Sequence, residues 1–249
     1  MVKVKEIIER RPHLRDPLRI YEKVLQFQRA AAGLCRIPGT PPEPCYPLEC
    51  REPVLERFAS IFGFSEEILA PLGEAMRLGH VDFTRLPLNE VPAFSLPYHE
   101  DELAQILFLL GKPYFLAQGE SFREGNLSWQ EGRCPVCHAA PAIAVLAQEG
   151  RRLHCSFCGT EGFFKRVGCP VRPADDASKI RIFTFQDEEG FRVDGCDECG
   201  TYVKTITADL LKEMSPDLAD MVSLPLDIVA QGKGYRRLSP NPIGITKVV

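Results

Sequence analysis

The first half of the chain carries apolar residues at helical spacing. Leu18, Tyr21 and Leu25 lie three or four positions apart, and the same spacing recurs in later segments. Because an α-helix repeats every 3.6 residues, such positions share one face that can be buried. The spacing predicts helices over residues 16–32, 54–62, 65–76 and 100–110.

Capping residues and helix breakers predict where these helices begin and end. Asp16 is expected to cap the first helix and Gly33 to end it. The Gly-Lys-Pro run at 111–113 is expected to stop the last helix, because proline removes a backbone donor and clashes with the preceding turn. Residues 36–50 and 84–97 are rich in proline and are predicted to be loops.

The pattern changes near residue 125, where short β-like runs replace the helical spacing. Each run is bounded by a cysteine pair, by glycine, or by proline and aspartate, and the runs are 142–147, 162–167, 180–186 and 191–193. Helical spacing returns after residue 204 and is interrupted at Pro225. The chain is therefore predicted to be an α+β protein, with a helical first part, two small β modules and a C-terminal helix.

Composition and charge narrow the class of protein. The chain has 249 residues, a net charge of -4 and 45% apolar residues, which is typical of a globular protein and gives no reason to expect a polyanionic partner. No apolar run reaches the roughly 18 residues of a membrane span, and the first residues lack a signal-peptide apolar region. We therefore expect a protein without membrane insertion, whose ten cysteines stay reduced.

Most of the cysteines are clustered, since seven of the ten lie between positions 134 and 199. Two Cys-x-x-Cys turns, at 134–137 and 155–158, are separated by 17 residues, a spacing typical of a zinc ribbon. Each turn places two thiolates on one side of a tight loop, and two facing turns form a tetrahedral sulfur cage. We therefore predict a metal site whose ligands are Cys134, Cys137, Cys155 and Cys158.

Three further cysteines predict a second, less complete site. Cys196 and Cys199 form another Cys-x-x-Cys turn, and Cys169 begins a similar turn in which Arg172 replaces the second cysteine. Arginine stays protonated and does not ligate metals. The fourth position is open to one of the two aspartates at 175–176, to a histidine or to water, and an unfilled site or a catalytic zinc are further alternatives.

The spacing alone does not fix which turns face each other. Sequential pairing joins the first two turns and leaves Cys169 with Cys196 and Cys199, whereas crossed pairing joins the second turn to the last. We prefer the sequential version because short loops close at a lower entropy cost. Four sulfurs suit either zinc or iron, and iron in such a site would add redox activity.

The cysteine turns have neighbours that a generic zinc ribbon lacks. Cys-Pro-Val-Cys is followed by Pro141, and the later segments read LHCSFCGTE and CDECGTYVK, with a helix behind them that ends near residues 234–235. In order and spacing these segments, from about residue 133 to about 243, resemble the FdhE family of formate dehydrogenase accessory proteins. The helical half agrees with that family in character but has few diagnostic residues.

The resemblance implies a fold, a function and a partner. Members have a helical N-terminal domain and two rubredoxin-like modules that bind iron or zinc, so the expected units are residues 1–128, 129–166 and 167–249, the last with the C-terminal helix. Members are cytoplasmic and are not known as enzymes. They are required for assembly or activation of molybdenum- or tungsten-containing formate dehydrogenases, and the expected partner is the catalytic subunit of that enzyme.

Some residues depart from the family pattern or have alternative roles. Besides Arg172, His138 stands where glycine commonly follows the first turn. Because His138 and His154 each lie next to a better thiolate ligand, we expect them to face solvent or to support the ligands. Tyr202 is expected to pack within a strand, and Lys204 to leave its ammonium in solvent.

Two other functions are weighed against the accessory role. A nucleic-acid-binding zinc ribbon is disfavoured, because residues 133–203 hold nine Lys or Arg and ten Asp or Glu, a net charge of -1. An iron-dependent electron-transfer protein is the other alternative. The sequence has no Ser-His-Asp order, phosphate loop or dinucleotide glycine pattern. We therefore predict a non-enzymatic accessory or chaperone protein for formate dehydrogenase.

Overall fold

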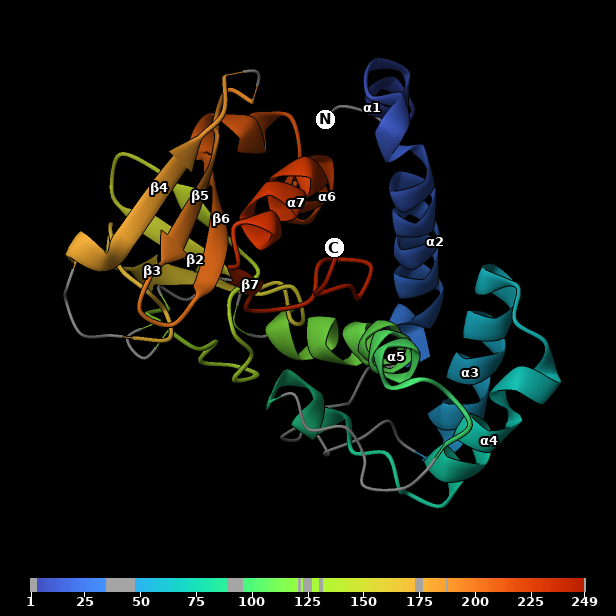
Figure 1. The fold of residues 1–249 in the computed structure, drawn as a ribbon. Coiled ribbons are helices and arrows are strands. Elements are labelled where there is room, and N and C mark those ends of the chain that lie inside the picture. Colours follow the sequence, from blue (N-terminus) through green and yellow to red (C-terminus); the bar gives the residue numbers. More distant parts are fainter. Residues whose placement is uncertain are drawn as a thin grey trace.

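The computed structural model describes residues 4–34, 48–88, 96–120, 122, 127–129, 132–172, 177–186 and 188–248. Figure 1 shows two parts, with the N-terminal helices on one side and the strands on the other. Helices α6 and α7 lie between the sheet and α2. This is the α+β arrangement that the sequence predicts, and none of the described helices is long and apolar enough to cross a membrane.

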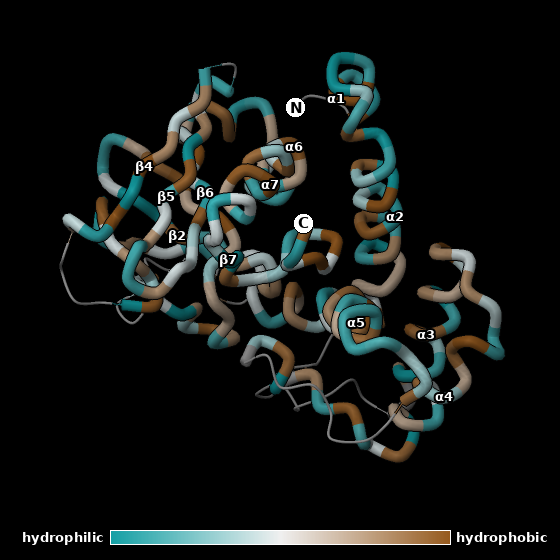
Figure 2. Tube along the Cα trace, viewed as in Figure 1, coloured by the Kyte–Doolittle hydropathy of each residue, from teal (hydrophilic) through white to brown (hydrophobic). Residues whose placement is uncertain are grey.

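The helical part is built from five α-helices in the described ranges. They are α1 (Val4–Arg10), α2 (Arg15–Ala31), α3 (Leu48–Phe62), α4 (Glu66–Arg77) and α5 (Glu100–Glu120), with short 3-10 turns between some of them. Hydrophobic and hydrophilic positions alternate along α2 (Figure 2), and the residues at 18, 21, 24 and 27 are buried. The predicted Asp16 cap is wrong, because the helix starts earlier, with Leu14 at the N-cap and Asp16 in the first turn.

Helix α5 does not stop at the Gly-Lys-Pro run, and the prediction of an end there is wrong. The helix continues to Glu120, with residues 106–115 all buried. Pro113 deprives the carbonyl of Leu109 of its usual donor, which costs helix stability. Because the residues on both sides of Pro113 are packed in the core, burial outweighs that loss, as tertiary contacts commonly do for helices.

The strands of both predicted modules join in one seven-stranded sheet within the described residues. They are β1 (Ile143–Leu146), β2 (Arg151–His154), β3 (Glu161–Phe164), β4 (Ile180–Thr184), β5 (Phe191–Cys196), β6 (Thr201–Thr207) and β7 (Arg236–Arg237). The order is β3-β2-β1-β6-β5-β4, and β7 pairs with β6. Two antiparallel three-stranded units thus meet at a parallel β1–β6 pair, in which Ile143 is opposite Lys204. The boundaries of the three units stay a prediction.

The predicted C-terminal helix is divided into two. Helix α6 (Pro216–Val222) and helix α7 (Leu224–Gly232) follow a 3-10 turn, and Pro225 lies in the first turn of α7. The side chain of Ser215 caps α6 by accepting a hydrogen bond from the backbone N–H of Leu218 (3.2 Å). The interruption expected at Pro225 is therefore confirmed.

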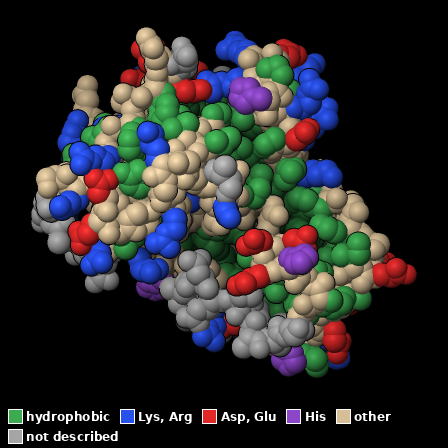
Figure 3. All heavy atoms as spheres, viewed as in Figure 1, with side chains coloured by type: hydrophobic (Ala, Val, Ile, Leu, Met, Phe, Trp, Pro, Cys, Tyr) green, Lys and Arg blue, Asp and Glu red, His purple; other side chains and the backbone are tan. Residues whose placement is uncertain are grey.

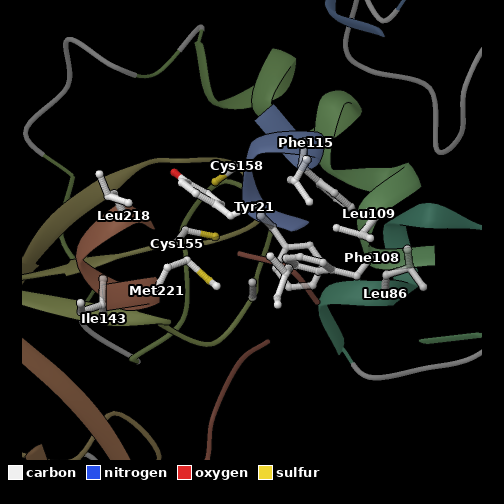
Figure 4. Close-up of a cluster of buried hydrophobic side chains, with 14 of the residues drawn as sticks. Tyr21, Leu86, Phe108, Leu109, Phe115, Ile143, Cys155, Cys158, Leu218 and Met221 are labelled. Atoms are coloured by element: carbon white, nitrogen blue, oxygen red, sulfur yellow. The ribbon is translucent and has the colours of Figure 1, made fainter. Parts of the chain in front are cut away.

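The hydrophobic core is continuous from the helices to the sheet. In Figure 4 the thiols of the second cysteine turn lie between aromatic residues of the helical part and apolar residues of the sheet and α6. The labelled residues that meet there include Tyr21, Phe108, Phe115, Ile143, Cys155, Cys158 and Met221. The second cysteine turn therefore lies at the junction of the two parts of the molecule.

Candidate metal centres

The three Cys-x-x-Cys turns share one backbone geometry. In each, the N–H of the residue after the second cysteine donates to the carbonyl of the first over 2.9–3.0 Å, in the pairs His138–Cys134, Gly159–Cys155 and Gly200–Cys196. The donor residue has a positive φ in all three, at 63°, 71° and 66°. Glycine adopts this conformation freely, and histidine is among the residues enriched there. His138 therefore adopts the backbone conformation that glycine adopts in the other two turns, and its side chain is exposed.

The first cluster brings four sulfurs together. The Sγ atoms of Cys134 and Cys158 are 3.4 Å apart, as are those of Cys137 and Cys155, and all four lie within 4.8 Å of one another. A zinc tetrahedron with bonds of about 2.3 Å places its sulfurs about 3.8 Å apart. The four cysteines are free thiols whose positions fit such a cage. The first two turns therefore face each other, which is the sequential pairing preferred from the sequence.

The first cluster is closed to solvent. Cys134, Cys155 and Cys158 are fully buried and Cys137 is nearly so. Hydrogen bonds from the neighbouring thiols hold the pKa of Cys134 well below its usual range, whereas burial raises the pKa of Cys155. Thiolate charge gathered in so little space needs a counter-charge, which a divalent cation supplies. Such an ion would have no open position for a substrate.

The second cluster joins three sulfurs and is more open. Cys169, Cys196 and Cys199 have Sγ atoms within 4.8 Å of one another, with 3.5 Å between the first and the last. Cys199 is half-buried, unlike the other two. Burial raises the pKa of Cys169 to about 12, although backbone N–H groups act in the opposite direction. The three cysteines could hold a cation whose fourth ligand comes from another group.

The fourth position of the second cluster has no ligand among the described residues. Arg172 is exposed, and its Nε lies 3.7 Å from a carboxylate oxygen of Glu198, so it is held at the surface. Asp175 and Asp176, the candidates from the sequence, lie outside the described residues. Neither described histidine near a cysteine turn joins a cluster.

Phe157, which lies inside the second turn, joins the first cluster to the helical part. Its ring meets Phe108 and Phe115 of α5 edge-on, with centroids 4.8 Å and 5.4 Å away, and it is buried. Nearby, a Cβ added to Gly119 of α5 would lie 1.9 Å from the carbonyl oxygen of Cys158. Helix α5 therefore packs directly against the backbone of the turn, where only glycine fits.

His154, predicted to face solvent or support a ligand, is buried in a chain of charges beside the first cluster. Its Nε2 lies 3.1 Å from Asp217, and the other carboxylate oxygen of Asp217 accepts a hydrogen bond from Lys112 over 2.8 Å. Burial opposes the charged imidazole, but Asp217 and Glu161 outweigh it and raise the pKa of His154 to about 9. These contacts join α5, α6 and β2 next to Cys155.

Lys204 is not solvated, and that prediction is wrong. Its ammonium is buried under the sheet, 2.7 Å from Asp220 and 2.6 Å from Asp227. Arg237 pairs with both carboxylates, and Tyr202, buried as expected, donates to Asp227 over 2.6 Å. Two cations and two anions thus balance each other, which is the condition for keeping charges inside a protein. Burial opposes ionisation of Asp227, but Arg237 and Lys204 outweigh it and lower its pKa.

The sequence reasoning also missed two hydroxyls that lie against the sulfurs. Thr160 and Thr201 each follow the second cysteine of a turn by two positions, and each hydroxyl is within hydrogen-bond distance of a cysteine sulfur. The signal was present in the sequence, since Cys-Gly-Thr occurs at both 158–160 and 199–201.

The surface seen in Figure 3 carries mixed charge. Lys and Arg side chains are interspersed with Asp and Glu over that face, which has no extended region of one sign. Together with the net charge of -4, this is unlike the basic stripe of a nucleic-acid-binding protein.

Fold and clusters together define a protein with an N-terminal helical part, a rubredoxin-like sheet and two cysteine clusters able to hold metal. The family model for the C-terminal domain of FdhE matches residues 176–243. The chain is 32% identical to Protein FdhE of Escherichia coli O1:K1, of Shigella boydii serotype 18 and of Escherichia fergusonii over 118 residues, 45% of this chain. That stretch spans 38% of the length of each relative. The C-terminal part of the chain is therefore similar in sequence to FdhE proteins.

The fold is also that of a solved relative. The crystal structure of the FdhE protein from Pseudomonas aeruginosa matches with a TM-score of 0.66, covering 96% of this chain and 92% of that one. At 19% sequence identity the match shows a common fold. It extends over the helical part, which has few diagnostic residues in its sequence.

Proposed function

We propose that this protein is a non-enzymatic accessory protein that acts in the cytoplasm on formate dehydrogenase. The similarity of its C-terminal part to FdhE proteins supports the accessory role. Its partner would be the catalytic subunit of that enzyme, bound during assembly or activation. The protein would present a rigid surface to this partner and carry out no turnover of its own.

The observation that carries this proposal is the closed set of four sulfurs at the junction of the two parts. Cys134, Cys137, Cys155 and Cys158 would hold one zinc or iron ion, and that ion would neutralise their charge. Small modules bury too little apolar surface to stand alone, so coordination supplies stability that their core lacks. An enclosed ion without an open position suits a structural role rather than a catalytic one.

The second cluster would hold a second ion less tightly. Cys169, Cys196 and Cys199 supply three thiolates, and the half-buried Cys199 leaves this cluster nearer to solvent. Elemental analysis of the purified protein would give the ratio of each metal to chain. A ratio of one or two zinc or iron ions agrees with the proposal, and a protein that takes up neither metal contradicts it.

The accessory role is tested by complementation. A bacterial strain that lacks its own FdhE family member would receive the wild-type chain or the Cys134→Ser variant. We expect the wild type to restore formate dehydrogenase activity and the variant to restore little, because the first module loosens without its ligand. Co-purification with the catalytic subunit should be lost in parallel.

A matched control is Cys50→Ser, which removes a half-buried thiol of α3 outside both clusters. This variant should keep its metal and its ability to restore activity. If Cys134→Ser restored activity fully while its metal content fell, the metal would not serve the accessory function. If the wild-type chain restored no formate dehydrogenase activity and bound no catalytic subunit, the proposed partner would be incorrect.

A further inference from the structure

We propose that the hydroxyls of Thr160 and Thr201 donate hydrogen bonds to the metal-binding thiolates and so control how firmly each cluster keeps its ion. This inference rests on the metal binding in the proposed function. The Oγ1 atom of Thr160 lies 3.1 Å from the sulfur of Cys134 and 3.0 Å from that of Cys158. In the second cluster, Oγ1 of Thr201 lies 2.9 Å from the sulfur of Cys199.

The direction of these hydrogen bonds follows from the chemistry of the ligands. Cysteine binds a metal as a thiolate, which has no proton and can only accept. A threonine hydroxyl carries one proton, so with an ion bound it must be the donor. Thr160 is buried, with 2% of its surface exposed, so bulk water does not replace it.

The backbone of the turn does not require a threonine at this place, as the first turn shows. The N–H of Cys134 donates to the carbonyl of Ala139 (2.8 Å) just as the N–H of Cys155 donates to that of Thr160 (3.0 Å). Ala139 is buried and holds the same turn without a hydroxyl. The hydroxyl of Thr160 is therefore not needed to form the turn, and its partners are the sulfurs.

The arrangement is repeated in the second cluster, about forty residues further on. Gly159 and Gly200 have φ angles of 71° and 66°, and each places the following threonine beside the sulfur of the preceding cysteine. Two separate turns thus combine the same dipeptide with the same contact. The repetition favours a role at the sulfur over chance packing.

The bonds should slow metal loss for two physical reasons. A donor spreads the negative charge of a buried thiolate, which is costly to keep in low dielectric. It also makes the sulfur a weaker base, so protons compete less well with the ion. Partners that hold metal ligands in this way commonly change metal affinity by about 10- to 100-fold.

The test measures zinc transfer from zinc-loaded full-length protein to a chromophoric chelator. A Cys199→Ser background isolates the first cluster. We expect Thr160→Val, which keeps the shape of the side chain, to release zinc about 10- to 100-fold faster. Thr160→Ser, which keeps the hydroxyl, should release it at close to the parent rate. The matched control is Thr205→Val, which removes an equally buried hydroxyl that donates to Asp194 rather than to sulfur.

Cobalt-loaded protein gives a second measurement that a packing defect would not change. Loss of the donor raises the energy of the sulfur lone pairs, so the thiolate-to-cobalt band of Thr160→Val should move to longer wavelength. The band should stay in place in Thr205→Val. If Thr160→Val failed to fold, Thr201→Val with the first cluster intact would test the same shift at the second cluster, whose cobalt band is obtained by subtracting the spectrum of the Cys199→Ser protein.

The outcomes separate this inference from the proposed function. A Thr160→Val protein with the parent release rate and an unmoved band overturns the role of the hydroxyl, while metal binding stands. A wild-type protein that takes up neither zinc nor cobalt overturns both. Faster release and a moved band in Thr160→Val, with recovery in Thr160→Ser, supports the inference.

Discussion

The two cysteine clusters belong to similar turns in similar three-stranded units, yet their surroundings differ. The first cluster has four sulfurs, is enclosed, and has the aromatic residues of α5 packed against it. The second has three sulfurs, one of them half-buried. Beneath the second unit, Lys204 and Arg237 face Asp220 and Asp227 in a buried network.

The difference indicates that the two units are stabilised in different ways. The first unit contains both the metal ligands and the contact between sheet and helices. Loss of its ion should therefore destabilise both parts of the molecule. The second unit has strand pairing, two covering helices and a balanced set of charges of its own. We therefore expect its fold to depend less on an ion, which agrees with a cluster that lacks a fourth cysteine.

The largest expected effect is from breaking the first cluster. Cys155→Ser removes a fully buried ligand, so the ion should be lost and much of its contribution to folding with it. Folding energies coupled to structural zinc are on the order of 10 kcal/mol, so we expect a loss of about 5 kcal/mol or more, or a first unit that does not fold. Urea denaturation with parallel metal analysis measures this.

Cys199→Ser is the variant to compare with Cys155→Ser, because it removes the most exposed ligand of the second cluster. Its unfolding free energy should fall much less, and hydrogen exchange should change mainly near the second cluster. Equal losses in the two variants would contradict the difference between the units.

The second prediction concerns the buried charge network beneath the second unit. Lys204→Met leaves two buried carboxylates with Arg237 as their remaining cation. Removing one member of a buried charge network commonly costs about 3–5 kcal/mol, and we expect an effect of that size in urea denaturation. The metal content of the first cluster should be unchanged.

A double variant and a surface control sharpen this prediction. Adding Asp220→Asn to Lys204→Met rebalances the charges and should recover part of the stability. Lys212→Met removes an exposed lysine paired with Asp209 and should leave the unfolding free energy near that of the wild type. If Lys204→Met were as mild as Lys212→Met, the network would not stabilise the second unit.

The third prediction concerns the contact between the first cluster and the helices. Phe157→Leu keeps an apolar side chain but loses the edge-on contacts with Phe108 and Phe115. We expect a loss of about 2 kcal/mol, because aromatic pairs add to area burial and the leucine fills the space imperfectly. Limited proteolysis should cut between the helical part and the sheet more readily. An unchanged cleavage rate would show that the two parts are held elsewhere.

The cysteine turns could be predicted from the sequence because their geometry is local. Four residues and the residue that follows them, which is glycine in two of the three turns, define each turn, and the spacing of 17 residues brings two turns together. Helices α2 to α4 and the first half of α5 were predicted in the same way, from periodicity, whereas α1 was not predicted. At His138 the backbone overrides the usual preference for glycine, and the sequence showed the departure without its consequence.

The features that escaped prediction depend on contacts between distant segments. Lys204 meets carboxylates 16 and 23 residues further on, and a rule that places lysine in solvent takes no account of them. Their signal was weak but present, since Asp220 and Asp227 occur among apolar residues of the predicted C-terminal helix. The continuation of α5 through Pro113 likewise follows from burial, which a breaker rule ignores. The parallel β1–β6 pairing joins segments about sixty residues apart and leaves no local pattern.

The smallest expected effect concerns how the helical part is held to the second unit. Arg11, after α1, donates two hydrogen bonds to Glu188 in the loop before β5, over 2.7 Å and 2.9 Å. Both side chains are partly exposed, so the pair should contribute only about 0.5–1 kcal/mol. A double-mutant cycle with Arg11→Gln and Glu188→Gln measures this coupling, which should shrink as salt is added. The helices would then be joined to the first unit by buried aromatic contacts and to the second partly by a salt-sensitive ion pair. A coupling as large as the loss in Phe157→Leu, and insensitive to salt, would remove this distinction.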